Sequence, residues 1–99
     1  MKYIKAIVDC IDEELEGAQN YAEKYVEMKS LDKSSWASRF KSMAEDELKH
    51  AMYNHDYAVE EITRLKSVYQ PTNEMLEHWD AEHRKYVDKT AWIKQMISM

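Results

Sequence analysis

The sequence predicts an all-α protein, in which a long antiparallel helical hairpin is followed by a third helix. Only two of the 99 residues are Gly or Pro, on which the frequent turns of a β-rich domain depend. Three segments also carry apolar residues at alternating spacings of three and four, as one face of a helix requires. The length allows one domain, assigned to residues 1–99.

The first helix is expected over about residues 2–29, with Glu14 in the middle of its apolar stripe. The other stripe residues are Ile4, Ile7, Ile11, Ala18, Tyr21, Tyr25 and Met28. Cys10 is expected to be a small buried thiol beside this stripe. Gly17 inside the helix costs about 1 kcal/mol relative to alanine. The polar run 30–34 ends the helix, and Asp32 or Ser34 is expected to cap the next one.

The second helix is expected over about residues 35–68 and carries two neighbouring stripes. One stripe consists of Trp36, Phe40, Met43, Glu47, His50, Asn54 and Tyr57. The other consists of Ala44, Leu48, Ala51, His55, Ala58, Ile62 and Leu65. Such a wide face is typical of a helix with two neighbours.

The third helix is expected over about residues 73–98. Pro71 keeps Gln70 out of the helical region, and Thr72 or Asn73 is a good N-cap. Its stripe consists of Leu76, Trp79, His83, Tyr86, Thr90, Ile93 and Ile97.

The helix lengths predict an incomplete core. The second helix alone would be about 50 Å long, whereas a compact domain of this size has a radius of gyration near 13 Å. We therefore expect a second copy to complete a four-helix bundle, as a homodimer or a ring of dimers.

Charge excludes several classes of partner. There are 14 basic and 19 acidic residues, giving a net charge of −5. A nucleic-acid binder or a polybasic membrane-surface protein needs the opposite balance. No apolar run is long enough to span a membrane, and the N-terminus is unlike a signal peptide. The single cysteine suits a cytoplasmic location.

Three polar residues occupy stripe positions where apolar residues are expected: Glu14, Glu47 and His50. Glu47 and His50 form a Glu-x-x-His motif whose side chains project from one side of a helix. Folding about the loop at 30–34 brings Glu14 to nearly the same height. A carboxylate and an imidazole so placed can bind one cation. The alternative is an ion pair in the core or interface, or a simple surface pair.

One chain supplies one Glu and one Glu-x-x-His, which is half of the ligand set of a di-iron carboxylate bundle. The missing core and the half set of ligands therefore call for the same dimer.

The stretches 11–21 and 44–51 resemble the ferritin-like superfamily, and within it the short encapsulated-ferritin type, whose ferroxidase centre lies between two subunits. The resemblance covers about two-thirds of the chain. It implies oxidation of Fe(II) by dioxygen, with Glu14 bridging the ions and Glu47 and His50 completing each. Tyr21 matches a tyrosine near the metals, which implies a catalytic role for it, and Glu13 or Glu16 matches an acidic entry route.

The cofactor implied by the resemblance is a pair of iron ions, with Mn, Zn or Ca as alternatives. Asn20 stands where that family often has an aromatic residue, and the third segment is longer than the family's short tail. A shell protein is a conceivable partner, although we see no targeting tail.

Two further hypotheses remain open from the sequence. The chain could keep the ferritin-like fold and bind metal for structure instead of catalysis. The chain could also be a non-catalytic helical assembly or adaptor protein, such as a phage structural protein, whose polar core residues set the interface.

A second polar cluster of unassigned role lies in the third segment, where His83 is on the apolar stripe. It comprises Glu74, His78, Asp80 and His83.

Overall fold

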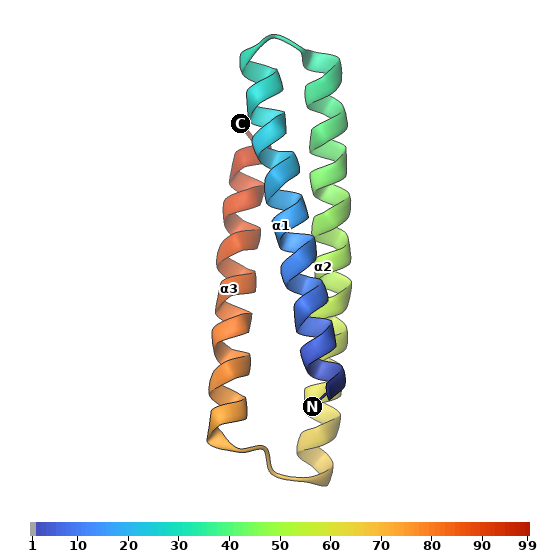
Figure 1. The fold of residues 1–99 in the computed structure, drawn as a ribbon, viewed down its shortest axis with the longest axis vertical. Coiled ribbons are helices and arrows are strands. Elements are labelled where there is room, and N and C mark those ends of the chain that lie inside the picture. Colours follow the sequence, from blue (N-terminus) through green and yellow to red (C-terminus); the bar gives the residue numbers. More distant parts are fainter. Residues whose placement is uncertain (1) are drawn as a thin grey trace.

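The computed structural model describes residues 2–99, and the side chains from residue 4 onward. It contains three helices: α1 (Lys2–Ser30), α2 (Ser34–Val68) and α3 (Asn73–Ile97). Figure 1 shows α1 and α2 as an antiparallel hairpin, with α3 returning alongside α1. These bounds agree with the predicted helices to within one residue, and no strand occurs in the described chain. No described helix combines the length and apolar character needed to cross a membrane.

The molecule is as elongated as the helix lengths predict. Its principal extents are 55 × 17 × 17 Å, and its Cα radius of gyration is 16.0 Å. This radius exceeds the value of about 13 Å for a compact domain of this size. The helices consequently share a thin core that runs along the bundle axis.

The core of α1 follows a heptad-like line of alternating steps of four and three. It consists of Ile4, Val8, Ile11, Leu15, Ala18, Ala22 and Tyr25. The predicted stripe was wrong in part, because Ile7, Glu14, Tyr21 and Met28 are only half-buried at its edge. Each of these four residues is adjacent to the buried line. The helix buries a broad face, and periodicity alone did not locate its centre.

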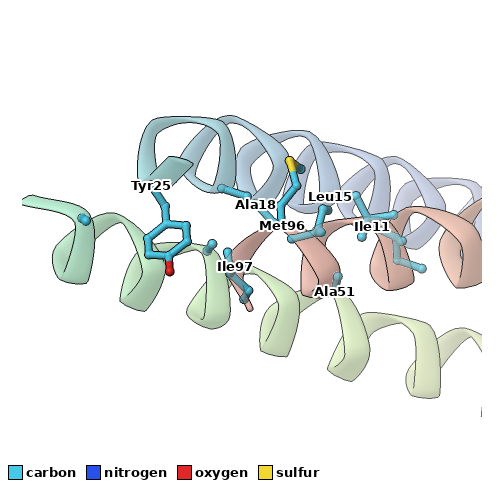
Figure 2. Close-up of a cluster of buried hydrophobic side chains, with 11 residues drawn as sticks. Ile11, Leu15, Ala18, Tyr25, Ala51, Met96 and Ile97 are labelled. Carbon is cyan, nitrogen blue, oxygen red and sulfur yellow. The ribbon is translucent and has the colours of Figure 1, made fainter. Parts of the chain in front are cut away.

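Alanine recurs every seven residues on the buried side of α2: Ala37, Ala44, Ala51 and Ala58. Their small side chains let the backbones of α1 and α2 come close, while the larger side chains come from α1 and α3. Figure 2 shows Leu15 and Ile11 of α1 with Met96 and Ile97 of α3 in this cluster. Close packing therefore depends on small residues at fixed positions of α2.

The prediction that Asp32 or Ser34 caps the second helix is wrong. Asp32 has a positive φ of 58°, and its N–H donates to the carbonyl of Lys29 at 3.1 Å. The N–H of Lys33 donates to the carbonyl of Met28 at 2.9 Å. This is the double hydrogen bond that closes a helix C-terminus. Asp32 thus ends α1, and Lys33 precedes α2 without a side-chain cap.

The start of α3 is capped as predicted, since the hydroxyl of Thr72 accepts a hydrogen bond from the N–H of Met75 at 3.2 Å. Farther along, Lys85 Nζ lies 3.2 Å from Asp12 Oδ1, which ties α3 to α1. Ile93 is fully buried, whereas Trp79 near the other end is half-buried. The last part of α3 therefore carries most of its packing.

Candidate metal centre

The α1–α2 hairpin brings the three predicted polar residues together. His50 Nδ1 lies 3.4 Å from Glu47 Oε1 on the same helix and 3.9 Å from Glu14 Oε2 on the neighbouring one. Glu47 and His50 lie one turn apart on α2, so they project to the same side. The predicted match in height between Glu14 and this motif is confirmed.

Asn54 is a fourth member of this group, and sequence reasoning gave it no role. Its amide Nδ2 donates a hydrogen bond to Glu14 Oε1 at 2.7 Å. Glu14 therefore has Asn54 at one oxygen and His50 at the other. The available signal was the position of Asn54 one turn after His50 on the same predicted stripe.

The absence of a side chain at Gly17 leaves room for the carboxylate of Glu47. An ideal Cβ on Gly17 would lie 2.9 Å from Glu47 Oε2, closer than real Cβ atoms approach. The Glu47 carboxylate consequently lies over bare backbone of α1, three residues beyond Glu14. Close approach across the hairpin explains a glycine in the middle of this long helix.

The group lies at the surface of the hairpin. The side chains of Glu14 and Glu47 are 19% and 28% exposed, and that of His50 is 55% exposed. The carboxylates are thus partly desolvated, while the imidazole reaches solvent. An ion could approach them without any opening of the core.

We call this side of the hairpin the open face, and it also carries apolar side chains. Its residues are Glu14, Gly17 and Tyr21 of α1, with Trp36, Phe40, Met43, Glu47, His50, Asn54 and Tyr57 of α2. Trp36, Met43 and Tyr57 are exposed large hydrophobic residues. The contacts that join Glu14, Glu47, His50 and Asn54 involve no residue of α3.

One chain does not form a closed metal site by itself. Within the part of the chain that the structure describes, no three His, Cys, Asp or Glu side chains are arranged so that they could hold one ion. His50 instead pairs with each of the two carboxylates, Glu14 and Glu47. The chain brings the donors to one place and leaves the arrangement open on the solvent side.

Tyr21 lies farther along the same face. Its ring stacks on that of Phe40, with centroids 6.3 Å apart and an interplanar angle of 26°. No hydrogen bond joins Tyr21 to Glu14, Glu47 or His50 in the described chain. A catalytic role for Tyr21 stays a prediction, and so does an entry role for Glu13 and Glu16, both of which are exposed.

The structure also bears on Cys10 and on the polar cluster of the third helix. Cys10 is an exposed free thiol, so the prediction of a buried thiol was wrong. The buried line passes through Val8 and Ile11, and position 10 turns away from it.

Among the described residues, no hydrogen bond or ion pair joins the Glu74, His78, Asp80 and His83 side chains to one another. His83 instead pairs with His55 of α2.

Comparison of the chain with protein-family models, with curated proteins and with solved structures finds no match. The residues of the open face are therefore the basis on which a function can be inferred for this chain.

Proposed function

We propose that the chain is a ferritin-like di-iron protein, which oxidises Fe(II) with dioxygen at a site shared between two copies. The observation that carries this proposal is the meeting of Glu14, Glu47 and His50 across α1 and α2, within 3.9 Å. Residues so distant in sequence converge at one height of the hairpin. The biological role would be iron storage or detoxification, in the cytoplasm, whose reducing conditions suit the free thiol of Cys10.

The donor set suits iron. Carboxylate oxygens are hard anionic ligands, and imidazole adds a neutral nitrogen that iron also accepts. The amide of Asn54 donates a hydrogen bond to Glu14 Oε1 and so fixes the orientation of this carboxylate, as outer hydrogen bonds commonly do for metal-binding carboxylates. In the proposed site Glu14, Glu47 and His50 of both copies would hold the two iron ions, with Glu14 shared between them.

A second copy supplies what one chain lacks. Two chains facing each other through the open face would contribute two Glu14, two Glu47 and two His50, the full set of a di-iron carboxylate bundle. The same contact would cover Trp36, Met43 and Tyr57, which are exposed in one chain. A two-fold contact is self-complementary, so one patch meets its own copy.

The chemistry requires two electrons and two protons per dioxygen. Each of two Fe(II) ions gives up one electron, and dioxygen with two protons becomes hydrogen peroxide. The half-buried carboxylates stabilise the added positive charge of Fe(III) relative to Fe(II).

The test is titration of apo-protein with Fe(II) in air, followed by absorbance of Fe(III). We expect saturable oxidation near one iron per chain and a dimer or larger assembly by light scattering. The double variant E47A/H50A should lose the oxidation, and E45A, an exposed glutamate on the same helix, should keep it. Equal oxidation by E47A/H50A and the unaltered protein would contradict the proposal.

One observation favours a second candidate, a non-catalytic helical assembly protein. Asn54 donates a hydrogen bond to Glu14 across the hairpin, and His50 lies within 3.9 Å of both carboxylates, so this polar group also fits one that sets an interface. Elemental analysis of protein purified without added metal separates the two candidates. Metal near one ion per chain that is lost in E14A supports the iron protein. Absence of metal, with an altered oligomer mass in E47A, supports the assembly protein.

A further inference from the structure

A pair of histidines forms a direct contact between α2 and α3. His55 Nε2 on α2 lies 2.9 Å from His83 Nδ1 on α3. The His55 side chain is only 13% exposed, whereas His83 is exposed. Imidazole is the commonest side-chain ligand of metals in proteins. Two of them therefore meet at a seam that is open to solvent on one side.

The ring of His55 is held in a fixed orientation. Tyr86 stacks on it with centroids 4.2 Å apart and an interplanar angle of 6°, and the ring of Trp79 lies 5.9 Å away. Asp56 Oδ1 lies 3.4 Å from His55 Nδ1. With Nδ1–H donating to this carboxylate, the Nε2 lone pair faces His83. A carboxylate behind one imidazole nitrogen, with the other nitrogen free, is typical of metal-binding histidines.

We propose that His55 and His83 bind one divalent transition-metal ion, of the class Zn²⁺, Ni²⁺ or Cu²⁺, which joins α2 to α3. Imidazole nitrogens favour these ions over Mg²⁺ or Ca²⁺. Two nitrogens that bind one ion at about 2.05 Å lie about 2.9 Å apart at right angles, as in tetragonal Ni²⁺ or Cu²⁺ sites, and about 3.3 Å apart in a tetrahedral Zn²⁺ site. The two imidazole nitrogens, 2.9 Å apart in a hydrogen bond, are therefore already at a separation that one Ni²⁺ or Cu²⁺ ion requires, and a Zn²⁺ ion requires them to move apart by about 0.4 Å. Water completes the coordination on the exposed side.

Binding changes a tautomer and leaves the charge of the two histidines unchanged. Without an ion, His83 Nδ1–H donates to His55 Nε2. With an ion between them, the proton leaves His83 Nδ1, and His83 Nε2 takes one up from water. Both rings are neutral before and after, and no electron is transferred.

This site is separate from the proposed iron site. His55 lies five residues after His50 on α2, which turns it about 140° around the helix axis. It contacts α3, whereas His50 contacts α1. The two proposals can therefore fail independently.

Calorimetric titration of the full chain with Ni²⁺ tests the proposal. Because Ni²⁺ could also bind His50, the titration is made in the H50A background. We expect one ion per chain, with at least a tenfold loss of affinity when H83A is added. Addition of H78A, which removes an exposed histidine of the same helix, should change nothing. Equal affinity with and without H83A, or no binding at about millimolar Ni²⁺, would overturn the proposal.

A second measurement leaves both proposed ligands, His55 and His83, in place. The H50A protein is titrated with Ni²⁺ while the imidazole signals are followed by NMR, where the paramagnetic ion broadens nearby resonances. The signals of His55 and His83 should broaden together at the lowest Ni²⁺ concentrations, before that of His78. Broadening of His78 first, or of all three histidines equally, would contradict a site between α2 and α3.

Discussion

The carboxylate of Glu47 occupies the space in which a side chain at position 17 would begin. Its Oε2 atom would lie 2.9 Å from a Cβ on Gly17. The atom in the way is the end of a flexible side chain, so an added methyl group would displace Glu47 rather than the α1 backbone. A substitution at position 17 can therefore change the position of Glu47 without destabilising α1.

The G17A variant should be as stable as the unaltered chain or more stable, by up to about 1 kcal/mol, because alanine favours a helix interior. The same change should reduce Fe(II) oxidation, since the Glu47 carboxylate must leave its position against α1. Urea unfolding and the iron assay measure the two effects. N20A, at an exposed position of α1, controls for helix propensity alone. Full oxidation by G17A would show that the place of Glu47 over α1 is unimportant.

The hydrogen bond from Asn54 to Glu14 predicts a charge effect. In N54D a carboxylate replaces the amide donor that lies 2.7 Å from Glu14 Oε1. The like charges should lower the free energy of unfolding at pH 7 by about 1 kcal/mol, measured by urea denaturation. N20D adds the same charge at an exposed position of α1 and should have little effect. Equal stabilities of the two variants would argue against this contact.

The alanine heptad of α2 predicts that a larger side chain on its buried side is not tolerated. A51L adds three carbons at a fully buried position and should cost about 1–3 kcal/mol of unfolding free energy. A81L makes the same change at an exposed position of α3 and should cost little. Differential scanning calorimetry of both variants provides the comparison. A melting temperature of A51L equal to that of A81L would contradict the close approach of α1 and α2.

Thr90 carries a polar atom without a partner. Its Oγ1 is buried, and no hydrogen bond to it occurs among the described residues. Valine has the same shape without the hydroxyl, so T90V should stabilise the chain by about 1 kcal/mol. T63V is the control, because that hydroxyl is exposed and already donates to the carbonyl of Val59. Chemical denaturation that shows T90V to be less stable than the unaltered chain would disprove the prediction.

Tyr86 predicts a loss of stability at alkaline pH. Burial, with a smaller contribution from the charge of Asp56, raises the pKa of the Tyr86 hydroxyl above its ordinary value. The unfolded chain therefore releases this proton more readily. The contribution to stability is complete below pH about 10 and is lost as the pH rises through the folded pKa. Y86F keeps the stacked ring and removes the ionisation.

The free energy of unfolding, measured between neutral pH and pH about 11, should accordingly fall less steeply with pH for Y86F than for the unaltered chain. Y53F removes a hydroxyl from an exposed tyrosine of α2 and serves as the control. Identical pH dependence of the three proteins would contradict the raised pKa.

The local features of this protein could be predicted from its sequence. The three helices follow from apolar spacing and from the near absence of Gly and Pro, and Thr72 caps α3 as its position after Pro71 indicates. The convergence of Glu14 with Glu47 and His50 also follows, because an antiparallel hairpin about a short loop fixes relative height. The helices and the cap depend on residues within one helix or one turn, and the convergence depends only on the short loop that joins two consecutive helices.

Only the tertiary structure decided which side of each helix is covered. The buried line of α1 runs through Val8 and Leu15 instead of Ile7 and Glu14, and Cys10 consequently faces solvent. The pairing of His55 with His83 likewise depends on where α3 lies against α2. Helical periodicity specifies an apolar face about 100° wide or more. Its centre is set by the packing of neighbouring helices, which contribute side chains from distant parts of the chain.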